Sequence, residues 1–61
     1  MPTTSLPILL SVRDAADRLG VSTKTIRRWI ASGELPHYRL GRSIRIAESD
    51  LIGFIRVRRA M

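Results

Sequence analysis

The chain has 61 residues, and its 11 lysine and arginine residues against 5 aspartate and glutamate residues give a formal net charge of +6. A domain this short buries only about 60% of the surface that its unfolded chain exposes, which leaves little room for a substrate cavity. There is no cysteine and His37 is the only histidine, which excludes a disulfide framework and any thiolate or multi-histidine metal site.

No motif suggests an enzyme. The sequence shows no nucleophile with a nearby base, no pair of catalytic carboxylates and no phosphate-binding loop. We therefore expect a protein without enzymatic activity, without a cofactor and without a bound metal.

The first eight residues include two prolines and lack the basic start and long apolar run of a signal peptide. We expect residues 1–8 to be a flexible leader and residues 9–61 to form the folded domain, with Leu9 or Leu10 packing onto the core. The apolar run at residues 8–10 is too short to span a bilayer. We expect a cytoplasmic protein with no membrane contact, which the absence of cysteine also fits.

A first helix is predicted over about residues 12–19. The segment from Ser11 to Asp14 has the spacing of a capping box, with Asp14 in place of the usual Glu or Gln. Gly20 can supply the left-handed conformation that ends a helix. The residues expected to face inward are Ala15, Ala16 and Leu19.

A second helix is predicted over residues 23–32, with Ser22 as its N-terminal cap and Gly33 at its end. Only Gly20 and Val21 separate the two helices. Such a short joint with a glycine suits two helices that cross at a steep angle, as in a helix-turn-helix.

The second helix has an apolar face and a cationic face, as an advance of 100° per residue places its side chains. The apolar arc holds Ile26, Trp29 and Ile30, so we interpret Trp29 as a core anchor and not as a base-stacking platform. The opposite arc holds Lys24, Arg27, Arg28 and Ala31, with Thr23 at its edge. A row of cations is usually a solvated face, but this helix lacks the acidic residues that normally alternate with surface cations. We therefore expect its cationic face to contact DNA.

A β-hairpin is predicted next, since apolar and polar residues alternate at the period of half-buried strands. Its apolar positions are Tyr38, Leu40, Ile44 and Ile46. Gly41 and Arg42 stand where the chain must reverse, and glycine permits the positive φ of a hairpin turn. The apolar face should pack on the helices, because an isolated hairpin is barely stable in water. The other face would present Arg39 and Arg45, with Arg42 at the tip.

A third helix is predicted after the hairpin, with Glu48 and Asp50 in its first turn, where they complement the helix dipole. Its inner stripe is expected to hold Leu51, Phe54 and Ile55. Its last turn holds Arg56, Arg58 and Arg59. These arginines either stabilise the helix C-terminus or contact a phosphate or a partner protein, and the sequence favours neither role.

The net charge is concentrated in the second helix and the hairpin. Residues 22–46 carry six cations and one acidic residue, a net +5, whereas residues 1–21 sum to zero and residues 47–61 carry three cations and two acidic residues, a net +1. This concentration indicates a nucleic-acid partner. RNA is disfavoured, because the chain has three aromatic residues and lacks the exposed aromatics that stack on unpaired bases.

Five segments of the chain occur in the order and spacing of a known family: Leu10-Ser-Val-Arg-Asp-Ala-Ala, Leu19-Gly-Val-Ser, Thr25-Ile-Arg-Arg-Trp-Ile, Ser32-Gly-Glu-Leu-Pro and Arg39-Leu-Gly-Arg. Over about residues 9–55 the chain resembles excisionase-type DNA-binding proteins of the MerR-like winged helix-turn-helix superfamily. The resemblance implies a mainly α fold with a small β-hairpin, in which a helix-turn-helix is followed by a two-stranded wing and a C-terminal helix. It also implies that the second helix enters the major groove of double-stranded DNA while the wing reaches the adjacent backbone or minor groove.

The candidate DNA-binding residues are Ser22, Thr23, Lys24, Arg27 and Arg28 on the recognition helix and Arg39, Arg42 and Arg45 on the wing. MerR regulators dimerise through a long C-terminal helix and carry an effector domain beyond it, whereas this sequence stops at Met61. We therefore expect a monomer that binds adjacent DNA sites side by side, and not an effector-sensing regulator.

Two functions use such a surface equally well. An excisionase, or recombination directionality factor, would bind and bend attachment-site DNA with an integrase or other recombinase, at a deformation cost of about 1–6 kcal/mol. A phage or plasmid transcriptional regulator would use the same surface to block or recruit polymerase. A module that docks its third helix on a larger partner is a third class of function, but the core already needs most of the apolar residues.

Overall fold

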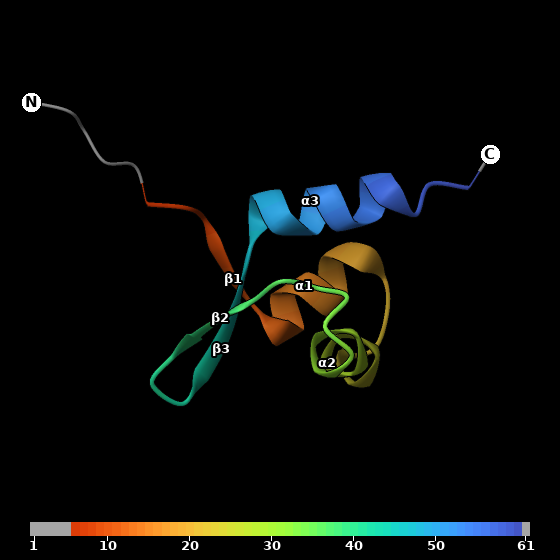
Figure 1. Cartoon of the computed structure of the whole chain (residues 1–61). Helices are drawn as coiled ribbons and strands as arrows, with labels where there is room; N and C mark the ends of the chain where they lie inside the picture. The colour runs from red at the N-terminus through yellow and green to blue at the C-terminus, as the bar shows by residue number, and fades with distance from the viewer. Residues whose placement is uncertain (1–5, 61) are drawn as a thin grey trace, which may run out of the picture.

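The structure, a computed structural model, describes residues 6–60. The first five residues of the expected leader and Met61 therefore lie outside the described part of the chain. The elements in chain order are β1 (Leu9–Ser11), α1 (Val12–Leu19), α2 (Thr23–Ala31), β2 (Tyr38–Leu40), β3 (Ser43–Ala47) and α3 (Glu48–Val57). Figure 1 shows α3 and α2 on opposite sides of α1, with the β2–β3 hairpin projecting away from the helices.

The caps predicted for the first two helices are confirmed. The Ser11 side chain accepts a hydrogen bond from the Asp14 backbone N–H at 3.0 Å, and Gly20 ends α1 in the left-handed conformation at φ 67°. At the start of α2, the Ser22 side chain accepts from the Thr25 N–H at 3.1 Å. Because the joint between the helices is so short, α2 lies steeply across α1, and Figure 1 shows α2 end-on.

The C-terminus of α2 directs the next segment into the core. After Ala31 the chain turns through Gly33, which has φ 81°. The N–H groups of Glu34 and Leu35 both donate to the Trp29 carbonyl oxygen, at 3.0 and 3.2 Å. This turn places the Leu35 side chain in the core, where it is 1% exposed. Leu35 was not among the residues predicted to lie in the core.

The core lies where α1, α2, α3 and the sheet meet, and its buried residues are Leu10, Val12, Ala15, Ala16, Ile26, Leu35, Ile46, Leu51 and Phe54. Trp29 packs against this core but is only partly buried, with its ring centroid 4.8 Å from that of Phe54. Trp29 therefore lies at the edge of the core, and the residue of α2 that is fully buried in the core is Ile26.

The sheet has three antiparallel strands in the order β1-β3-β2, and not the two strands expected. Strand β1 was not predicted, although the expected packing of Leu10 onto the core is confirmed at 4% exposure. Leu10 pairs with Ile46 and Ser11 with Arg45. The extra strand therefore makes β3 the central strand and joins the start of α1 to the hairpin.

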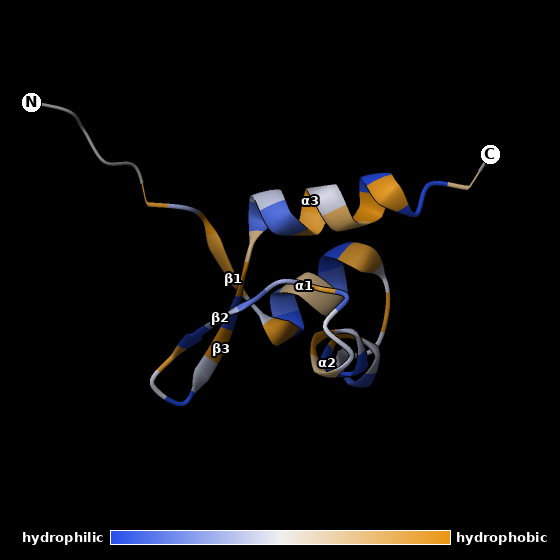
Figure 2. Ribbon diagram, viewed as in Figure 1, coloured by the Kyte–Doolittle hydropathy of each residue, from blue (hydrophilic) through white to orange (hydrophobic). Residues whose placement is uncertain are grey.

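The predicted apolar face of the hairpin is wrong for β2. Leu40 pairs with Ser43 across the two-residue turn, and Tyr38 pairs with Arg45. Paired residues share a face of the sheet, so Tyr38 and Leu40 lie on the face opposite the core, where they are 45% and 52% exposed. Figure 2 shows hydrophobic and hydrophilic residues alternating along these strands.

Helix α3 buries a narrow stripe. Leu51 and Phe54 are 3% and 6% exposed, whereas Ile55 is 44% exposed, which corrects its expected place in the core. Ile55 lies 100° around the helix from Phe54, beyond the face that the rest of the domain covers. Within residues 6–60, no helix has the length and apolar character needed to cross a membrane.

Candidate nucleic-acid interface

Helix α2 turns its cationic side to solvent. Lys24, Arg27 and Arg28 are all exposed, and so is Thr23. The core side of the same helix carries Ile26, so the two-faced pattern predicted from the sequence is confirmed. An α-helix is about 10–12 Å wide with its side chains, and the major groove of B-DNA is about 12 Å wide. The exposed side of α2 is therefore suited to enter that groove.

Ser22 has a structural role in this arrangement. Its hydroxyl oxygen caps α2 and lies 3.0 Å from the Thr25 hydroxyl. A side chain engaged in this way holds the first turn of the helix, which sets the direction of the exposed residues that follow it.

The hairpin carries three arginines, but they do not share one face. Arg39 pairs with Ile44, so it lies on the core side of the sheet near the edge, whereas Arg45 lies on the opposite side. Arg39 is exposed, and the half-buried Arg45 donates from its guanidinium to the Ile44 carbonyl oxygen at 3.0 Å. The expectation of one arginine face is therefore wrong. Arg42 is exposed at the tip beside Gly41, which has φ 64°.

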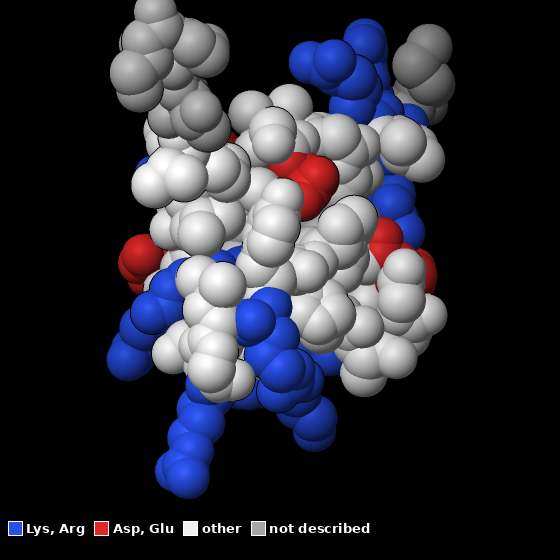
Figure 3. Space-filling model, turned by 60° about the vertical axis from the view of Figure 1, so that its left-hand side comes forward, with Lys and Arg blue, Asp and Glu red and all other residues white. Residues whose placement is uncertain are grey.

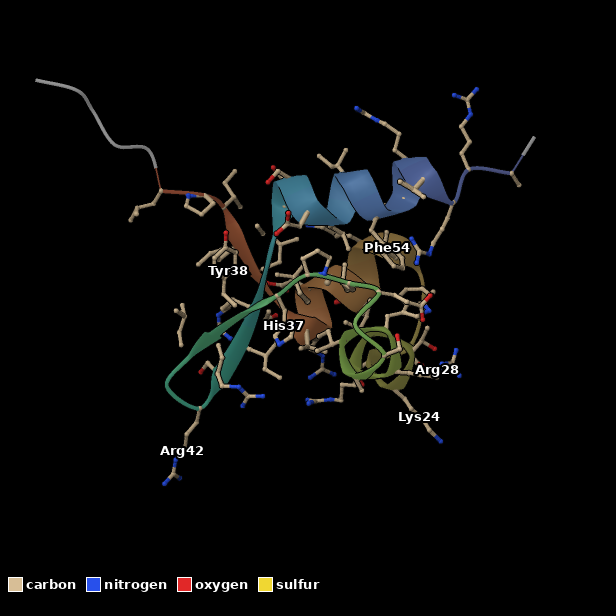
Figure 4. The ribbon with its side chains drawn as sticks, in the orientation of Figure 1. Lys24, Arg28, His37, Tyr38, Arg42 and Phe54 are labelled. Carbon is tan, nitrogen blue, oxygen red and sulfur yellow. The ribbon has the colours of Figure 1, made fainter. Side chains whose placement is uncertain are left out.

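The cations of α2 and of the hairpin nevertheless gather at one end of the molecule. Figure 3 shows one group of Lys and Arg side chains at the lower end of the molecule and a second group at the upper right, with the visible acidic side chains between them in height. In Figure 4, Lys24 from α2 and Arg42 from the hairpin tip extend toward the lower end. Two elements that are separate in the sequence thus form one basic surface.

Glu34 modifies the electrostatics at one margin of this surface. The pKa of its carboxyl group lies below the ordinary value of 4.5, mainly because it accepts a hydrogen bond from the Ser32 hydroxyl, at 2.6 Å. A hydrogen bond from Arg58 lowers the pKa further, and the charges of Arg58 and Arg28 act in the same direction. Arg28 therefore lies within the field of an ionised carboxylate.

Arg13 is a basic residue near this surface that the sequence analysis did not select. It is exposed in the first turn of α1 and lines a concavity of about 310 Å³ together with Arg27, Arg42 and Arg45. The sequence did not reveal it, because Asp14 and Asp17 are close to Arg13 in the chain and cancel its charge in the net charge of that segment. Its neighbours in space come from α2 and the hairpin.

The arginines at the end of α3 lie in a different environment. The Arg58 guanidinium lies 3.6 Å from the centroid of the Phe54 ring and forms an ion pair with Glu34 at 3.1 Å. These contacts favour a structural role for Arg58. Arg56 and Arg59 line an apolar groove of about 670 Å³ between α3 and the joint of the first two helices.

Comparison with known proteins gives three informative relatives. The excisionase of Mycobacterium phage D29 is 46% identical over 52 residues, which are 84% of this chain and 93% of the phage protein. The transcriptional repressor DcmR of Methylorubrum extorquens is 45% identical over 51 residues, 80% of this chain but only 19% of the repressor. The uncharacterized protein Rv2310 of Mycobacterium tuberculosis is 42% identical over 50 residues, 82% of this chain and 44% of that protein.

No solved structure gives a significant match. The model of the helix-turn-helix domain family matches residues 9–59, which include every helix and strand described above. Together with the phage excisionase, which aligns over nearly its whole length, this match shows that the chain belongs to the helix-turn-helix domain family, a family of DNA-binding proteins and not of enzymes.

Proposed function

We propose that this protein is an excisionase that binds and bends attachment-site DNA so that a recombinase can assemble on it. The observation that carries the proposal is the basic surface that α2 and the hairpin form together. Lys24 of α2 and Arg42 of the hairpin tip both point to the end of the molecule where this surface lies. The similarity to the phage D29 excisionase supports this role because the alignment spans 93% of that protein.

In this proposal α2 lies in the major groove and the β2–β3 hairpin acts as the wing of a MerR-like winged helix-turn-helix. The proposed DNA contacts are the cap residue Ser22 and, on α2, Thr23, Lys24, Arg27 and Arg28, and those of the wing are Arg39, Arg42 and Arg45. The wing arginines lie on both sides of a narrow hairpin, an arrangement suited to contacting the backbone on both sides of a groove. Neutralised phosphates and wing contacts offset the cost of bending, which is about 1–6 kcal/mol.

A transcriptional regulator is the second candidate function. The similarity to the repressor DcmR supports it, although the alignment spans only 19% of that protein. Both functions use the same DNA-facing residues. They differ in whether the DNA is bent and in where the site lies.

The salt dependence of binding to duplex DNA tests the surface itself. A duplex chosen by repeated selection from a random library would be titrated by fluorescence anisotropy at several salt concentrations. Six cations that each neutralised one phosphate would give a slope of log K against log salt of about −5, since each phosphate contributes about −0.9, and arginines that share a phosphate make the slope shallower. A matched variant in which Arg56 and Arg59 become Gln removes two cations from the other end of the molecule and should keep the native slope.

A slope near −1, or no binding to duplex DNA at low salt, would refute the proposed surface. To separate the two functions, the end-to-end distance of the bound duplex would be measured by energy transfer, and bound sites would be mapped by footprinting in cells. Bent DNA at a recombination attachment site supports the excisionase. Straight DNA at a promoter supports the regulator.

A further inference from the structure

Four arginines from three separate parts of the chain line one small concavity. Arg13 comes from the first turn of α1, Arg27 from α2, Arg42 from the hairpin turn and Arg45 from β3. They are half of the eight residues that line a volume of about 310 Å³, and none of these eight is acidic. We name this set of four residues the arginine cradle.

The sheet pairing explains how Arg13 reaches this place. Ser11 pairs with Arg45, so β1 fixes the first residues of α1 beside the central strand. Ser11 also caps α1, and Arg13 follows two residues later, in the first turn. The position of Arg13 is therefore set by the fold and not by a mobile segment.

The chemistry of the cradle fits an anion with several acceptor oxygens. Guanidinium groups are planar donors that match phosphate in geometry and keep their charge at all physiological pH values. Arg45 is held in place by its hydrogen bond to the Ile44 carbonyl oxygen at 3.0 Å. The N-terminus of α1 opens onto the same concavity, and the dipole of a helix favours negative charge at that end. Bringing four like charges together is unfavourable until an anion neutralises them.

We propose that the arginine cradle binds one backbone phosphate of the DNA, and that Arg13 is a DNA-contacting residue outside the surface predicted from the sequence. The inference rests on the proposed function, because the phosphate is that of the bound duplex. The inference also assigns two different roles to the exposed residues of α2. Arg27 holds the backbone, and discrimination between bases is left to Thr23, Lys24 and Arg28.

The first test compares Arg13→Gln with Arg56→Gln, which removes the same charge from an exposed position on α3. On the selected duplex at 0.1 M salt, Arg13→Gln should bind about tenfold more weakly than Arg56→Gln, the loss expected for one hydrogen bond to a charged group, while the other cradle arginines still neutralise the phosphate. The loss should be the same on all single-base variants of the site, and Arg27→Gln should behave alike. Arg13→Lys should avoid most of this loss, because it keeps the positive charge. Thermal unfolding of each variant confirms that it remains folded.

The second test locates the phosphate. Each phosphate of the duplex is replaced in turn by an uncharged methylphosphonate, and the affinity of each protein is measured. For the native protein and Arg56→Gln, the same methylphosphonate position should cause the largest loss of affinity. For Arg13→Gln and Arg27→Gln, which already lack part of the cradle, the methylphosphonate at that position should weaken binding little further. This non-additivity would identify the phosphate that the cradle contacts.

The outcomes separate the two proposals. If the native protein does not bind duplex DNA, the proposed function fails. If it binds but Arg13→Gln matches Arg56→Gln in affinity and slope, the cradle is overturned and the proposed function stands. If inorganic phosphate at constant ionic strength shifts the arginine NMR signals while Arg13→Gln still binds DNA like Arg56→Gln, the cradle takes a free anion and the inference is equally overturned.

Discussion

Arg58 is a residue whose role the sequence leaves open, and its contacts allow a quantitative prediction. Its guanidinium lies 3.6 Å from the centroid of the Phe54 ring, an interaction that contributes about 0.5–1 kcal/mol at an exposed site. The ion pair with Glu34 adds little, because the two side chains are 40% and 47% exposed and salt screens such pairs. We expect Arg58→Ala to lower the free energy of unfolding by about 1 kcal/mol and the Tm by about 4–8 °C.

The measurement is unfolding by heat and by urea, followed by circular dichroism. Arg59→Ala is the matched control, because it removes the same charge next to the end of α3 and should change the free energy of unfolding by less than about 0.5 kcal/mol. In a Phe54→Leu background the cost of Arg58→Ala should shrink, since the aromatic ring is gone. A coupling of this kind between the two substitutions assigns the stabilisation to the stacked pair.

Measurements of DNA binding can contradict this structural role of Arg58. Both arginine variants should keep the native salt slope, because neither residue is among the proposed DNA contacts. If Arg58→Ala unfolded like the native protein but bound DNA with a slope shallower by about one, Arg58 would be a phosphate contact. The structural role argued from its stacking would then be wrong.

Three further substitutions have defined outcomes. Trp29→Ala should lower the free energy of unfolding by about 3 kcal/mol, the low end for Trp→Ala because the ring is partly exposed; a variant that stayed as stable as the native protein but lost DNA binding would make Trp29 a DNA contact. Arg42→Ala should leave stability within about 0.5 kcal/mol but weaken binding on every sequence in gel shifts, because a contact to the backbone is lost; native affinity at two salt concentrations would remove the wing from the mechanism. Because the pKa of Glu34 is lowered by Ser32 and Arg58, its ionised form stabilises the fold above its ordinary pKa of 4.5, and this stabilisation is lost as the pH falls below that value. Melting curves between pH 6 and pH 3 should therefore show a steeper loss for the native protein than for Glu34→Gln, and parallel losses would contradict the assignment.

The helix boundaries could be predicted because the interactions that set them are local. Ser11 caps a backbone N–H three residues ahead, Ser22 does the same, and Gly20 ends α1 through its own φ angle. Each of these effects depends on residues within one turn of helix. The sequence therefore places α1 and α2 correctly, and with them the exposed cationic side of α2.

The faces of the hairpin could not be predicted from alternation alone. A two-residue turn pairs Leu40 with Ser43, so an even-numbered position of β2 shares its face with an odd-numbered position of β3. Tyr38 and Leu40 therefore lie on one face of the sheet and Ile44 and Ile46 on the other face, although all four follow the same alternating pattern. Alternation reports which residues of one strand share a face, and the register of the turn decides how two strands combine.

The candidate site was incomplete for a related reason, because charge summed along the chain is not charge summed in space. Arg13 is adjacent in sequence to Asp14, yet it lines a concavity with Arg27, Arg42 and Arg45. The connection is strand β1, a three-residue segment whose pairing with β3 joins the start of α1 to the hairpin. In an isolated segment of three residues nothing marks such a pairing, because the hydrogen bonds that define it are made with residues more than thirty positions away.

That connection also suggests how the two DNA-facing elements keep a fixed spacing. A two-stranded hairpin is barely stable alone, and β2 is exposed along its whole length, so β2 packing alone cannot hold the wing in position relative to α2. Strand β1 adds a second row of backbone hydrogen bonds to β3, and β1 continues directly into α1, which packs on α2. The distance between the proposed recognition helix and the proposed wing is therefore set through α1. A phosphate held between Arg13 of α1, Arg27 of α2 and the hairpin arginines would contact all three elements at once, and its position would fix the register of both reading elements on the duplex.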